Sequence, residues 1–322
     1  MSDLTVLVLA DPADPSLRLL ERLPDSTSIA CGNNAGAFLS SAPRADVILN
    51  WSGSRALFEE VWAMAPRVRW IHSRSAGLED LLFRALVDSA VPITNARGVF
   101  SRPLGEFAIA SVLFFAKDLR RMVRSQEAGT WDQFDIAEVH GATLGIIGFG
   151  DIGRACAERA TALGMKVIVL RRRPELSTGD PLPVRVFPPD RILELMALSD
   201  YVVVAAPLTP ETRGMIGMDE LSGMKRSAVL INLGRGPVVV EEALVRALRE
   251  RWIRGAALDV FDREPLPEGH PFYALDNVLL SPHIADHTPD WLERAMLLFL
   301  DNFGRFERGE PLRNLVDKKS GY

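Results

Sequence analysis

The chain is poor in cysteine and has no excess of positive charge. Its 322 residues include two cysteines, Cys31 and Cys156, which are far apart and in no metal-ligand spacing. Neither a disulfide framework nor a zinc site is expected, and a reducing cytoplasm is the natural setting. Asp and Glu number 42 against 37 Lys and Arg, which gives a formal net charge of −5. Because no general attraction for nucleic acid or anionic lipid results, any anionic ligand must be bound by a local cluster.

A basic leader and long apolar runs are also missing. The N-terminal residues 1–5 carry no basic region, and no stretch reaches the roughly 18 apolar residues of a membrane span. Secretion and membrane insertion are therefore not expected. A composition of 48% hydrophobic and 25% charged residues fits a globular protein, and 322 residues favour two domains.

Short apolar runs alternate with segments of helical periodicity. This pattern is typical of α/β proteins, in which helices cover both faces of parallel sheets. The first group of expected strands is Thr5–Ala10, Ala45–Asn50, Val68–Ser73 and a short one near Pro92–Thr94, with helices around Leu17–Leu23 and Ala56–Trp62. The second group is Thr143–Gly148, Lys166–Arg172, Tyr201–Ala206, Ala228–Gly234, Gly255–Val260 and Asn277–Ser281. Two doubly wound open sheets are predicted, the second with six strands.

Two further helices define the expected domain organisation. Residues 104–126 are apolar almost all round in their first half and basic in their second, which predicts a buried connecting helix. Thr288 as N-cap and Pro289 at the first helical position predict a helix that runs to about Arg308 and returns to the first domain. The sequence thus predicts a Rossmann domain over residues 104–286, inserted into a flavodoxin-like domain of residues 1–103 and 287–322.

The segment LGIIGFGDIG places Gly148, Gly150 and Gly153 in a G-x-G-x-x-G pattern between a predicted strand and a predicted helix. The first glycine allows a tight turn, the second lets a pyrophosphate approach the backbone, and the third lets helix and strand pack closely. Asp151 and Ile152 would offer backbone N–H groups at the helix N-terminus. The pattern predicts dinucleotide binding, and the alternative is a glycine-rich turn of any α/β protein.

The next strand ends in VIVLRRRP, with Arg171 where a carboxylate would bind the ribose 2′-hydroxyl of NAD. Arg171, Arg172 and Arg173 could hold a 2′-phosphate by charge-assisted hydrogen bonds. NADP is therefore the expected cofactor, with NAD as the second candidate. The alternative is a solvated basic turn.

Three charged residues end later strands of the same sheet. Arg235 and Glu264 follow successive strands, and His283 follows the last. Since ligands of open α/β sheets lie outside the carboxyl ends of the strands, the three are expected to converge on one edge. Singly, each has a plainer interpretation: a surface ion-pair partner, a turn carboxylate and a core histidine.

Together these residues suit the reduction of a 2-oxo acid. His283 can donate a proton to the carbonyl oxygen as hydride reaches the carbon, and can recover that proton in reverse. Glu264 behind the ring would fix its tautomer and favour the imidazolium. Arg235 would bind the substrate carboxylate and polarise the carbonyl, while a nicotinamide cofactor supplies the hydride.

Over nearly the whole chain, the sequence resembles the D-isomer-specific 2-hydroxyacid dehydrogenase family, and glyoxylate/hydroxypyruvate reductases in particular. The motifs are HGATLGIIGFGDIG, DYVVVAAPLTPETRGMI, MKRSAVLINLGRGPVV, GAALDVFDREPLP and NVLLSPHIADHT, in that order. The resemblance implies that Arg235, Glu264 and His283 are catalytic. It implies that Arg235 and His283 also contact the cofactor, together with Pro207, Thr212, Leu233, Gly234, Asp259 and Ala285.

The resemblance extends to the substrate loop. HSRSAGLEDL resembles the loop that binds the substrate carboxylate, which implies contacts from the backbone of Ala76 and Gly77 and an extra anion contact from Arg74. Glu106 matches the usual acid of the loop before the interdomain helix. The family commonly forms dimers through the dinucleotide domain, so Trp131 and Phe134 are candidate dimer contacts.

The resemblance leaves the substrate open. Glyoxylate or hydroxypyruvate is expected, because the chain ends soon after its last helix, without the regulatory extension of many phosphoglycerate dehydrogenases. The alternatives are phosphoglycerate dehydrogenase activity and a nucleotide-sensing corepressor on the same fold. The sequence departs from the family at Arg171 and at Ala285-Asp286-His287, which makes His287 a candidate substrate contact or an exposed residue before a helix cap.

Overall fold

The computed structural model describes residues 3–79 and 81–319, which form two compact units. The first unit comprises the described residues up to Phe100 and from Thr288 onward. The second unit, Ser101–His287, interrupts the first. The borders expected at residues 104 and 287 lie three residues and one residue from these positions.

The first unit is built on a five-stranded parallel sheet in the order β2-β1-β3-β4-β5. Its strands are β1 (Thr5–Leu9), β2 (Ser28–Gly32), β3 (Val47–Asn50), β4 (Trp70–Ser73) and β5 (Ile93–Thr94). This is the flavodoxin-like order, with a reversal of strand sequence between β1 and β3. The expected fold class is confirmed, but β2 was not among the expected strands.

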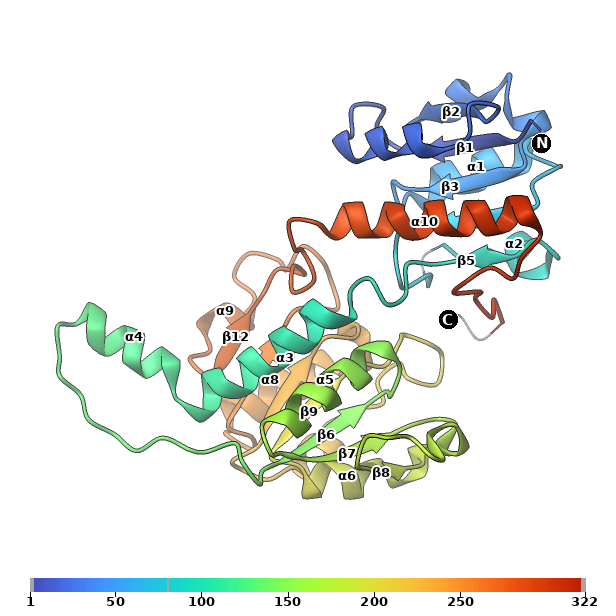
Figure 1. Cartoon of the computed structure of the whole chain (residues 1–322). Coiled ribbons are helices and arrows are strands. Elements are labelled where there is room, and N and C mark those ends of the chain that lie inside the picture. The colour runs from blue at the N-terminus through green and yellow to red at the C-terminus, as the bar shows by residue number, and fades with distance from the viewer. Residues whose placement is uncertain (1–2, 80, 320–322) are drawn as a thin grey trace. The chain divides into compact units, whose positions relative to one another are not determined.

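Helices cover this sheet and bury its central strands. They are α1 (Arg55–Met64), α2 (Arg84–Asp88), α10 (Trp291–Arg308) and the 3-10 helices η1 (Pro15–Arg22), η2 (Ala35–Phe38) and η3 (Ala42–Arg44). Figure 1 shows α10 running along the sheet, where the Phe299 ring stacks on that of Trp70 at 5.5 Å. The helix begins later than expected, with Asp290 as its N-cap, and the Thr288 hydroxyl donates to Asp290 at 2.8 Å instead of capping the helix.

The second unit contains a seven-stranded parallel sheet in the order β12-β11-β10-β9-β6-β7-β8. Its strands are β6 (Thr143–Ile147), β7 (Lys166–Leu170), β8 (Val184–Phe187), β9 (Tyr201–Val204), β10 (Val229–Asn232), β11 (Gly255–Leu258) and β12 (Val278–Leu280). The strand sequence reverses between β6 and β9, as in a Rossmann domain. The six expected strands are present, and the edge strand β8 was missed.

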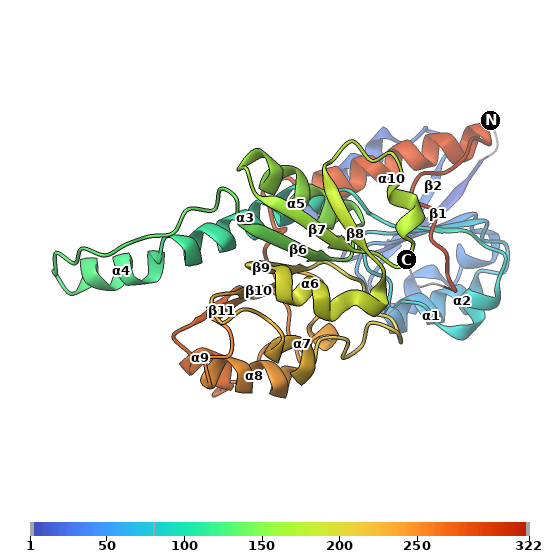
Figure 2. The same cartoon turned by 90° about the horizontal axis from the view of Figure 1, so that it is seen from below.

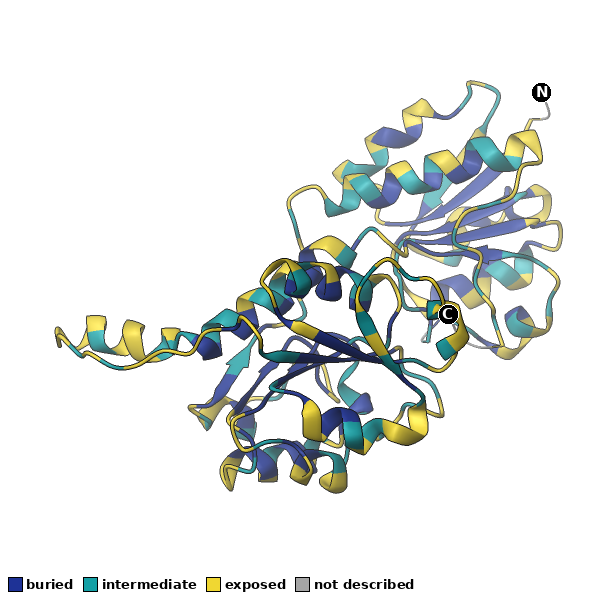
Figure 3. Ribbon diagram, turned by 60° about the horizontal axis from the view of Figure 1, so that its bottom comes forward, coloured by how far each residue is buried: buried dark blue, intermediate teal, exposed yellow. Residues whose placement is uncertain are grey.

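Helices lie on both faces of the second sheet. They are α3 (Ser101–Ala116), α4 (Leu119–Glu127), α5 (Asp151–Ala162), α6 (Ile192–Leu198), α7 (Met218–Ser222), α8 (Glu241–Arg249), α9 (Pro271–Ala274) and the 3-10 helices η4 (Pro174–Ser177), η5 (Pro189–Arg191) and η6 (Gly236–Val238). Figure 2 shows α3 and α5 on one face and α6, α7 and α8 on the other. Buried strands and outward exposed helix faces give the usual α/β layering (Figure 3). None of the helices in residues 3–79 and 81–319 is long and apolar enough to cross a membrane.

The expected single buried helix over residues 104–126 is wrong in its second half. The chain breaks between α3 and α4, where Asp118 adopts a φ of +48°. α3 buries one side against α5, but none of the α4 residues is buried. Figures 1 and 2 both show α4 and the segment after it projecting from the second sheet. The charged side chains of LRRMVR explain the difference, because guanidinium groups are rarely buried without partners.

Candidate active site

The glycine turn between β6 and α5 has the geometry that a dinucleotide needs. Gly148 adopts a φ of +95°, and a Cβ there would approach the amide nitrogen of Ala206 to 2.7 Å. A Cβ on Gly153 would lie 2.1 Å from the Gly148 carbonyl oxygen, so this glycine brings the helix against the turn. A Cβ on Gly150 would meet nothing within 4 Å. The first and third glycines are thus required by the fold, whereas the second borders open space that fits a pyrophosphate.

The three arginines follow β7, at the same edge of the sheet. Arg171 is half-buried and donates from Nη1 to the Ser177 hydroxyl at 2.8 Å, while Arg172 and Arg173 are exposed. The Arg171 guanidinium lies 5.9 Å from the ring centre of Phe149, a residue of the glycine turn. The chain therefore presents positive charge beside the glycine turn, which suits a phosphate on the adenosine ribose.

The loop that carries Arg235 is fixed by a buried amide. Asn232, the last residue of β10, accepts the Gly234 N–H at 3.1 Å and donates to the Arg235 carbonyl at 3.1 Å. A Cβ on Gly234 would lie 2.6 Å from the Ala206 carbonyl oxygen, so this loop packs directly on the end of β9. Sequence reasoning missed Asn232: its position at the end of a strand is visible in the sequence, but its contacts with the following loop are not.

Glu264 and His283 form the expected pair. His283 Nδ1 lies 2.7 Å from Glu264 Oε2, and the other carboxylate oxygen accepts the Phe261 N–H at 3.0 Å. A Cβ on Gly236 would be 1.9 Å from the Phe261 carbonyl carbon, so the loop after Arg235 lies against the loop that leads to Glu264. The structure thus brings the loops of the three expected catalytic residues to one edge of the sheet.

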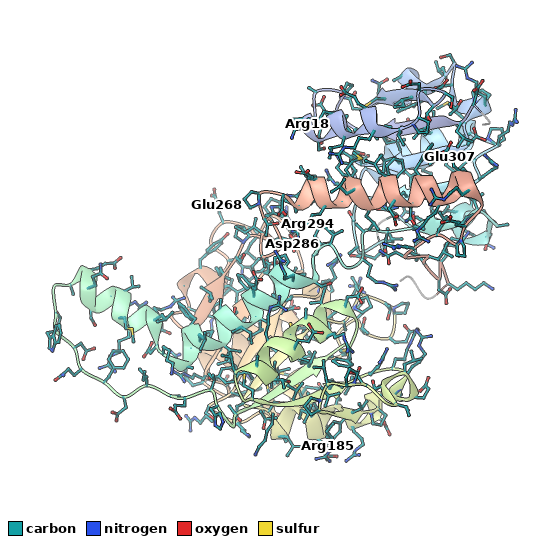
Figure 4. The ribbon with its side chains drawn as sticks, in the orientation of Figure 1. Arg18, Arg185, Glu268, Asp286, Arg294 and Glu307 are labelled. Atoms are coloured by element: carbon teal, nitrogen blue, oxygen red, sulfur yellow. The ribbon has the colours of Figure 1, made fainter. Side chains whose placement is uncertain are left out.

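Asp259 braces the loop that follows the histidine. Its buried Oδ1 accepts the N–H groups of Ile284 and Ala285 at 3.0 and 3.1 Å. Asp286, labelled in Figure 4, is half-buried on the same loop. Burial and the carboxylate of Asp259 raise the pKa of Asp286, although the charges of His287 and His283 act in the opposite direction. The exposed His287 lies 3.7 Å from Asp286.

The other expected cofactor contacts occupy the same edge. Thr212 donates its hydroxyl to the Pro207 carbonyl at 2.6 Å and accepts the Thr209 N–H at 2.8 Å, which closes the loop after β9. Leu233 is buried beneath the Arg235 loop, and Ala285 is held by Asp259. The expected contacts therefore follow the ends of four strands of one sheet: β9, β10, β11 and β12.

The substrate loop expected at Ala76 and Gly77 follows β4 in the first unit. The Ala76 carbonyl accepts the Asn95 side-chain N–H at 2.6 Å, and the Ser75 carbonyl accepts the Ala96 N–H at 3.2 Å. The N–H groups of Ala76 and Gly77 donate to no residue within 3–79 or 81–319. The loop thus uses its carbonyl groups to hold its position and leaves two donors for an anion.

Glu106 lies outside these clusters. It is on α3 and forms exposed ion pairs with Arg102 at 3.8 Å and Arg159 at 3.5 Å. The contact with Arg159 links α3 to α5. The structure therefore gives Glu106 a place on the surface of the second unit.

The second unit has the fold of a nicotinamide-dependent oxidoreductase: a Rossmann sheet with an open glycine turn and a histidine–glutamate pair at one edge. The chain belongs to the D-isomer specific 2-hydroxyacid dehydrogenase family, whose NAD binding domain matches residues 109–285.

Two related proteins support the same family assignment. A glyoxylate reductase of Korarchaeum cryptofilum is 35% identical over 269 residues, which cover 81% of this chain and 79% of the relative. A D-3-phosphoglycerate dehydrogenase of Methanocaldococcus jannaschii is 30% identical over 314 residues, 97% of this chain but 59% of the relative.

Solved structures extend the likeness to the whole chain. A D-isomer specific 2-hydroxyacid dehydrogenase of Xanthobacter autotrophicus, in complex with NADPH and MES, is 31% identical with a TM-score of 0.86, and all of both chains is covered. An NADPH-dependent glyoxylate/hydroxypyruvate reductase of Sinorhizobium meliloti, in complex with NADP and sulfate, is 26% identical with a TM-score of 0.85 and 99% and 100% coverage.

Proposed function

We propose that this chain reduces glyoxylate or hydroxypyruvate with NADPH, and oxidises the corresponding D-2-hydroxy acid in reverse. The observation that carries the proposal is the 2.7 Å contact between His283 and Glu264, on loops that lie beside that of Arg235. The named functions of the K. cryptofilum and S. meliloti proteins support the substrate.

Each catalytic residue has a separate task. His283 Nε2 gives a proton to the substrate carbonyl oxygen during reduction and takes it back during oxidation. Glu264 accepts from Nδ1 and so fixes the tautomer and the orientation of the ring. Arg235 binds the substrate carboxylate and polarises its carbonyl, which orients the substrate for hydride transfer.

The cofactor supplies the hydride, and this chain supplies its binding site. Gly148, Gly150 and Gly153 shape the pyrophosphate turn, and Asp151 and Ile152 offer N–H groups at the start of α5. Arg171, Arg172 and Arg173 bind the 2′-phosphate, which gives NADPH preference over NADH. Further contacts come from Pro207, Thr212, Leu233, Gly234, Arg235, Asp259, His283 and Ala285.

The substrate carboxylate is also bound by the N–H groups of Ala76 and Gly77, with Arg74 as an extra cationic group that contacts an anion. Phosphoglycerate dehydrogenase activity is the second candidate function, because the M. jannaschii relative has that name. A corepressor function finds no specific support, because the proton-transfer pair is intact.

We further propose a cytoplasmic homodimer. α4 and the segment after it expose Met122, Val123, Trp131 and Ile136, and the Trp131 side chain is 90% exposed. Phe134 packs under the Arg121 guanidinium at 4.2 Å. A second copy covering these apolar side chains would bury the projecting arm. Sedimentation of the wild type and of Trp131→Glu distinguishes a dimer from a monomer.

An absorbance assay tests the proposed activity. Purified protein is mixed with NADPH or NADH and a panel of 2-oxo acids that includes glyoxylate, hydroxypyruvate and 3-phosphohydroxypyruvate, and oxidation of the reduced cofactor is followed. We expect turnover of glyoxylate and hydroxypyruvate, faster with NADPH than with NADH. Tight cofactor binding without turnover of any substrate would favour the corepressor.

A further inference from the structure

Arg74, the residue after β4, is held between two indole rings of the first unit. Its guanidinium carbon lies 5.5 Å from the ring centre of Trp51 and 5.4 Å from that of Trp291. Trp51 is buried at the end of β3, and Trp291 is the first residue of α10. Both distances are in the cation–π range, so two separate elements fix the position of the charge.

Asp14, whose charge acts on Arg74, forms no ion pair with it. Asp14 accepts the Ser16 N–H and hydroxyl at 2.9 and 2.6 Å through Oδ1, and the Trp51 indole N–H at 3.0 Å through Oδ2. Burial acts to raise the pKa of Asp14, but these hydrogen bonds and the Arg74 charge leave it below its usual value. Asp14 is therefore an anion whose oxygens are already occupied by other donors.

The donors of Arg74 have no such partner. No hydrogen bond or ion pair joins its guanidinium to another residue in 3–79 or 81–319. Burial lowers the pKa of Arg74, and the charge of Asp14 offsets this only in part. A half-buried guanidinium with unused donors is a strong binding site for an anion that accepts two hydrogen bonds, because desolvated donors gain most from a charged partner.

The topology places this charge where a ligand is expected. The strand order β2-β1-β3-β4-β5 reverses between β1 and β3, and ligands of such sheets bind at the carboxyl ends beside that reversal. Asp14 follows β1, Trp51 follows β3 and Arg74 follows β4. The unused N–H groups of Ala76 and Gly77 lie on the same loop as Arg74.

We propose that Arg74 is a specificity-determining residue that binds a second anionic group of the substrate, in addition to the carboxylate bound by Ala76 and Gly77. The preferred substrate is then a 2-oxo acid with a further carboxylate or a phosphate, and the small monoanion glyoxylate is a poorer one. The inference rests on the proposed function and narrows its substrate class. Trp51 and Trp291 are positioning residues, because they hold the guanidinium without replacing its hydrogen bonds.

The test compares kcat/KM within two pairs of substrates that differ by one anionic group: oxaloacetate with 2-oxobutyrate, and 3-phosphohydroxypyruvate with hydroxypyruvate. We expect the wild type to have the higher kcat/KM for the dianion in at least one pair. The pair in which this occurs shows whether Arg74 binds a carboxylate or a phosphate. Arg74→Met should lower the ratio of kcat/KM for the dianion to kcat/KM for the monoanion about 10- to 100-fold, because a charged hydrogen bond is lost. Arg74→Lys keeps the charge without the planar fork and should give an intermediate ratio.

Arg84→Met is the matched control, because that arginine is in the same unit with a 97% exposed side chain. The ratio of kcat/KM for dianion and monoanion in Arg84→Met should equal that of the wild type. Preference for the monoanion in both pairs, or equal losses for both members in folded Arg74→Met or Arg74→Lys, would overturn the inference. Calorimetric titration with malonate and acetate gives a readout without turnover: malonate should bind more tightly to the wild type and lose that advantage in Arg74→Met. Absence of all 2-oxo acid reduction contradicts the proposed function, whereas equal binding of malonate and acetate contradicts the role of Arg74.

Discussion

Two carboxylates hold His283 from different directions. Glu264 contacts Nδ1 at 2.7 Å, and Asp259 accepts the N–H groups of Ile284 and Ala285 immediately after the histidine. The second contact stabilises a backbone whose φ of +55° at His283 lies in the left-handed region. Since Nδ1 is used by Glu264, Nε2 is the ring nitrogen that remains for the proposed proton transfer.

Glu264→Gln should retain measurable activity but lower kcat for 2-oxo acid reduction. An amide can turn its N–H as well as its oxygen toward Nδ1, so it no longer holds the ring in the single tautomer that a carboxylate selects. The measurement is kcat and KM for reduction. Glu268→Gln, an exposed change on the following loop, is the control and should leave both values unchanged. Full activity in Glu264→Gln would remove this carboxylate from the site.

His72 should make the first unit sensitive to acid. Its ring is fully buried, with Nδ1 2.7 Å from the Thr94 hydroxyl, and burial lowers the pKa of His72 to about 3. The unfolded chain binds this proton near pH 6.5, so stability falls as the pH drops from about 6.5 to about 3, by on the order of 5 kcal/mol.

Chemical denaturation at pH 7.5, 5.5 and 4.5 measures this effect. His72→Gln keeps a polar side chain but cannot titrate, so its free energy of unfolding should decline less with acid than that of the wild type. The control is pH 7.5, where the difference between the two proteins reports only packing and hydrogen bonding. Parallel pH dependences would show that His72 is not the acid-sensitive group.

The meeting of Glu264 with His283 beside the Arg235 loop could be predicted, because each residue follows a strand of one sheet. The hydrogen bonds that hold these loops in place could not be predicted, since they depend on loop geometry. Asn232 bonds to the backbone two and three residues further on, and Asp259 bonds to a loop that begins 25 residues later. The two indole rings beside Arg74 come from separate elements, so no local sequence pattern predicts their contact with it.

At the scale of single elements, the turn from β6 to α5 contains one glycine that the fold requires and one glycine that only cofactor binding would require. A Cβ on Gly153 collides with the Gly148 carbonyl, whereas a Cβ on Gly150 enters open space. We expect Gly153→Ala to lower the melting temperature of the apoprotein. Gly150→Ala should leave that temperature nearly unchanged and raise the KM for NADPH, since its methyl group occupies pyrophosphate space. Equal KM values for Gly150→Ala and the wild type would contradict this placement of the cofactor.

The basic turn after β7 sets the expected cofactor preference. A hydrogen bond to a charged group contributes about 1.5–3 kcal/mol, so one well-placed guanidinium favours NADPH by roughly ten- to a hundredfold. Exposure of Arg172 and Arg173 favours the lower end of this range and predicts that the preference weakens with added salt. Arg171→Asp should reverse the preference, because a carboxylate accepts from the ribose hydroxyl and repels phosphate.

The measurement is kcat/KM for NADPH and NADH at one ionic strength, in the wild type and in Arg171→Asp. Arg185→Asp is a control, because Arg185 lies on the edge strand β8 and pairs with Glu194 at 3.0 Å. Equal use of NADH by the wild type would make the three arginines a solvated turn, and the dehydrogenase assignment would stand.

The elements that sequence reasoning missed are those at sheet edges. β2 is exposed at its start and lacks a run of large apolar side chains, and β8 has four residues with Arg185 on its surface. Central strands such as β1 and β9 are buried throughout, and their continuous apolar runs were recognised. The break at Asp118 was missed because both α3 and α4 have helical periodicity, and only the backbone reveals the φ of +48°.

At the scale of the whole molecule, one unit is inserted in the other, and each has its own sheet and its own hydrophobic core. The alternation of strands and helices was enough to predict both sheets. The substrate could not be predicted in the same way, because the alternation of strands and helices does not reveal the geometry of the loops after the strands. The histidine–glutamate pair, the glycine turn and the family match at residues 109–285 all belong to the second unit, so the reaction class follows from that unit alone.

The most direct test of the central claim is steady-state turnover of the wild type, His283→Ala and Arg235→Ala with the best 2-oxo acid and cofactor. We expect the wild type to oxidise the reduced cofactor in the presence of the 2-oxo acid. His283→Ala should lower kcat by roughly 10²–10⁴, the loss of acid/base catalysis, and Arg235→Ala should raise KM and lower kcat because binding and orientation are both lost. Near-normal kcat in a folded His283→Ala variant would contradict the assignment of this chain's acid/base.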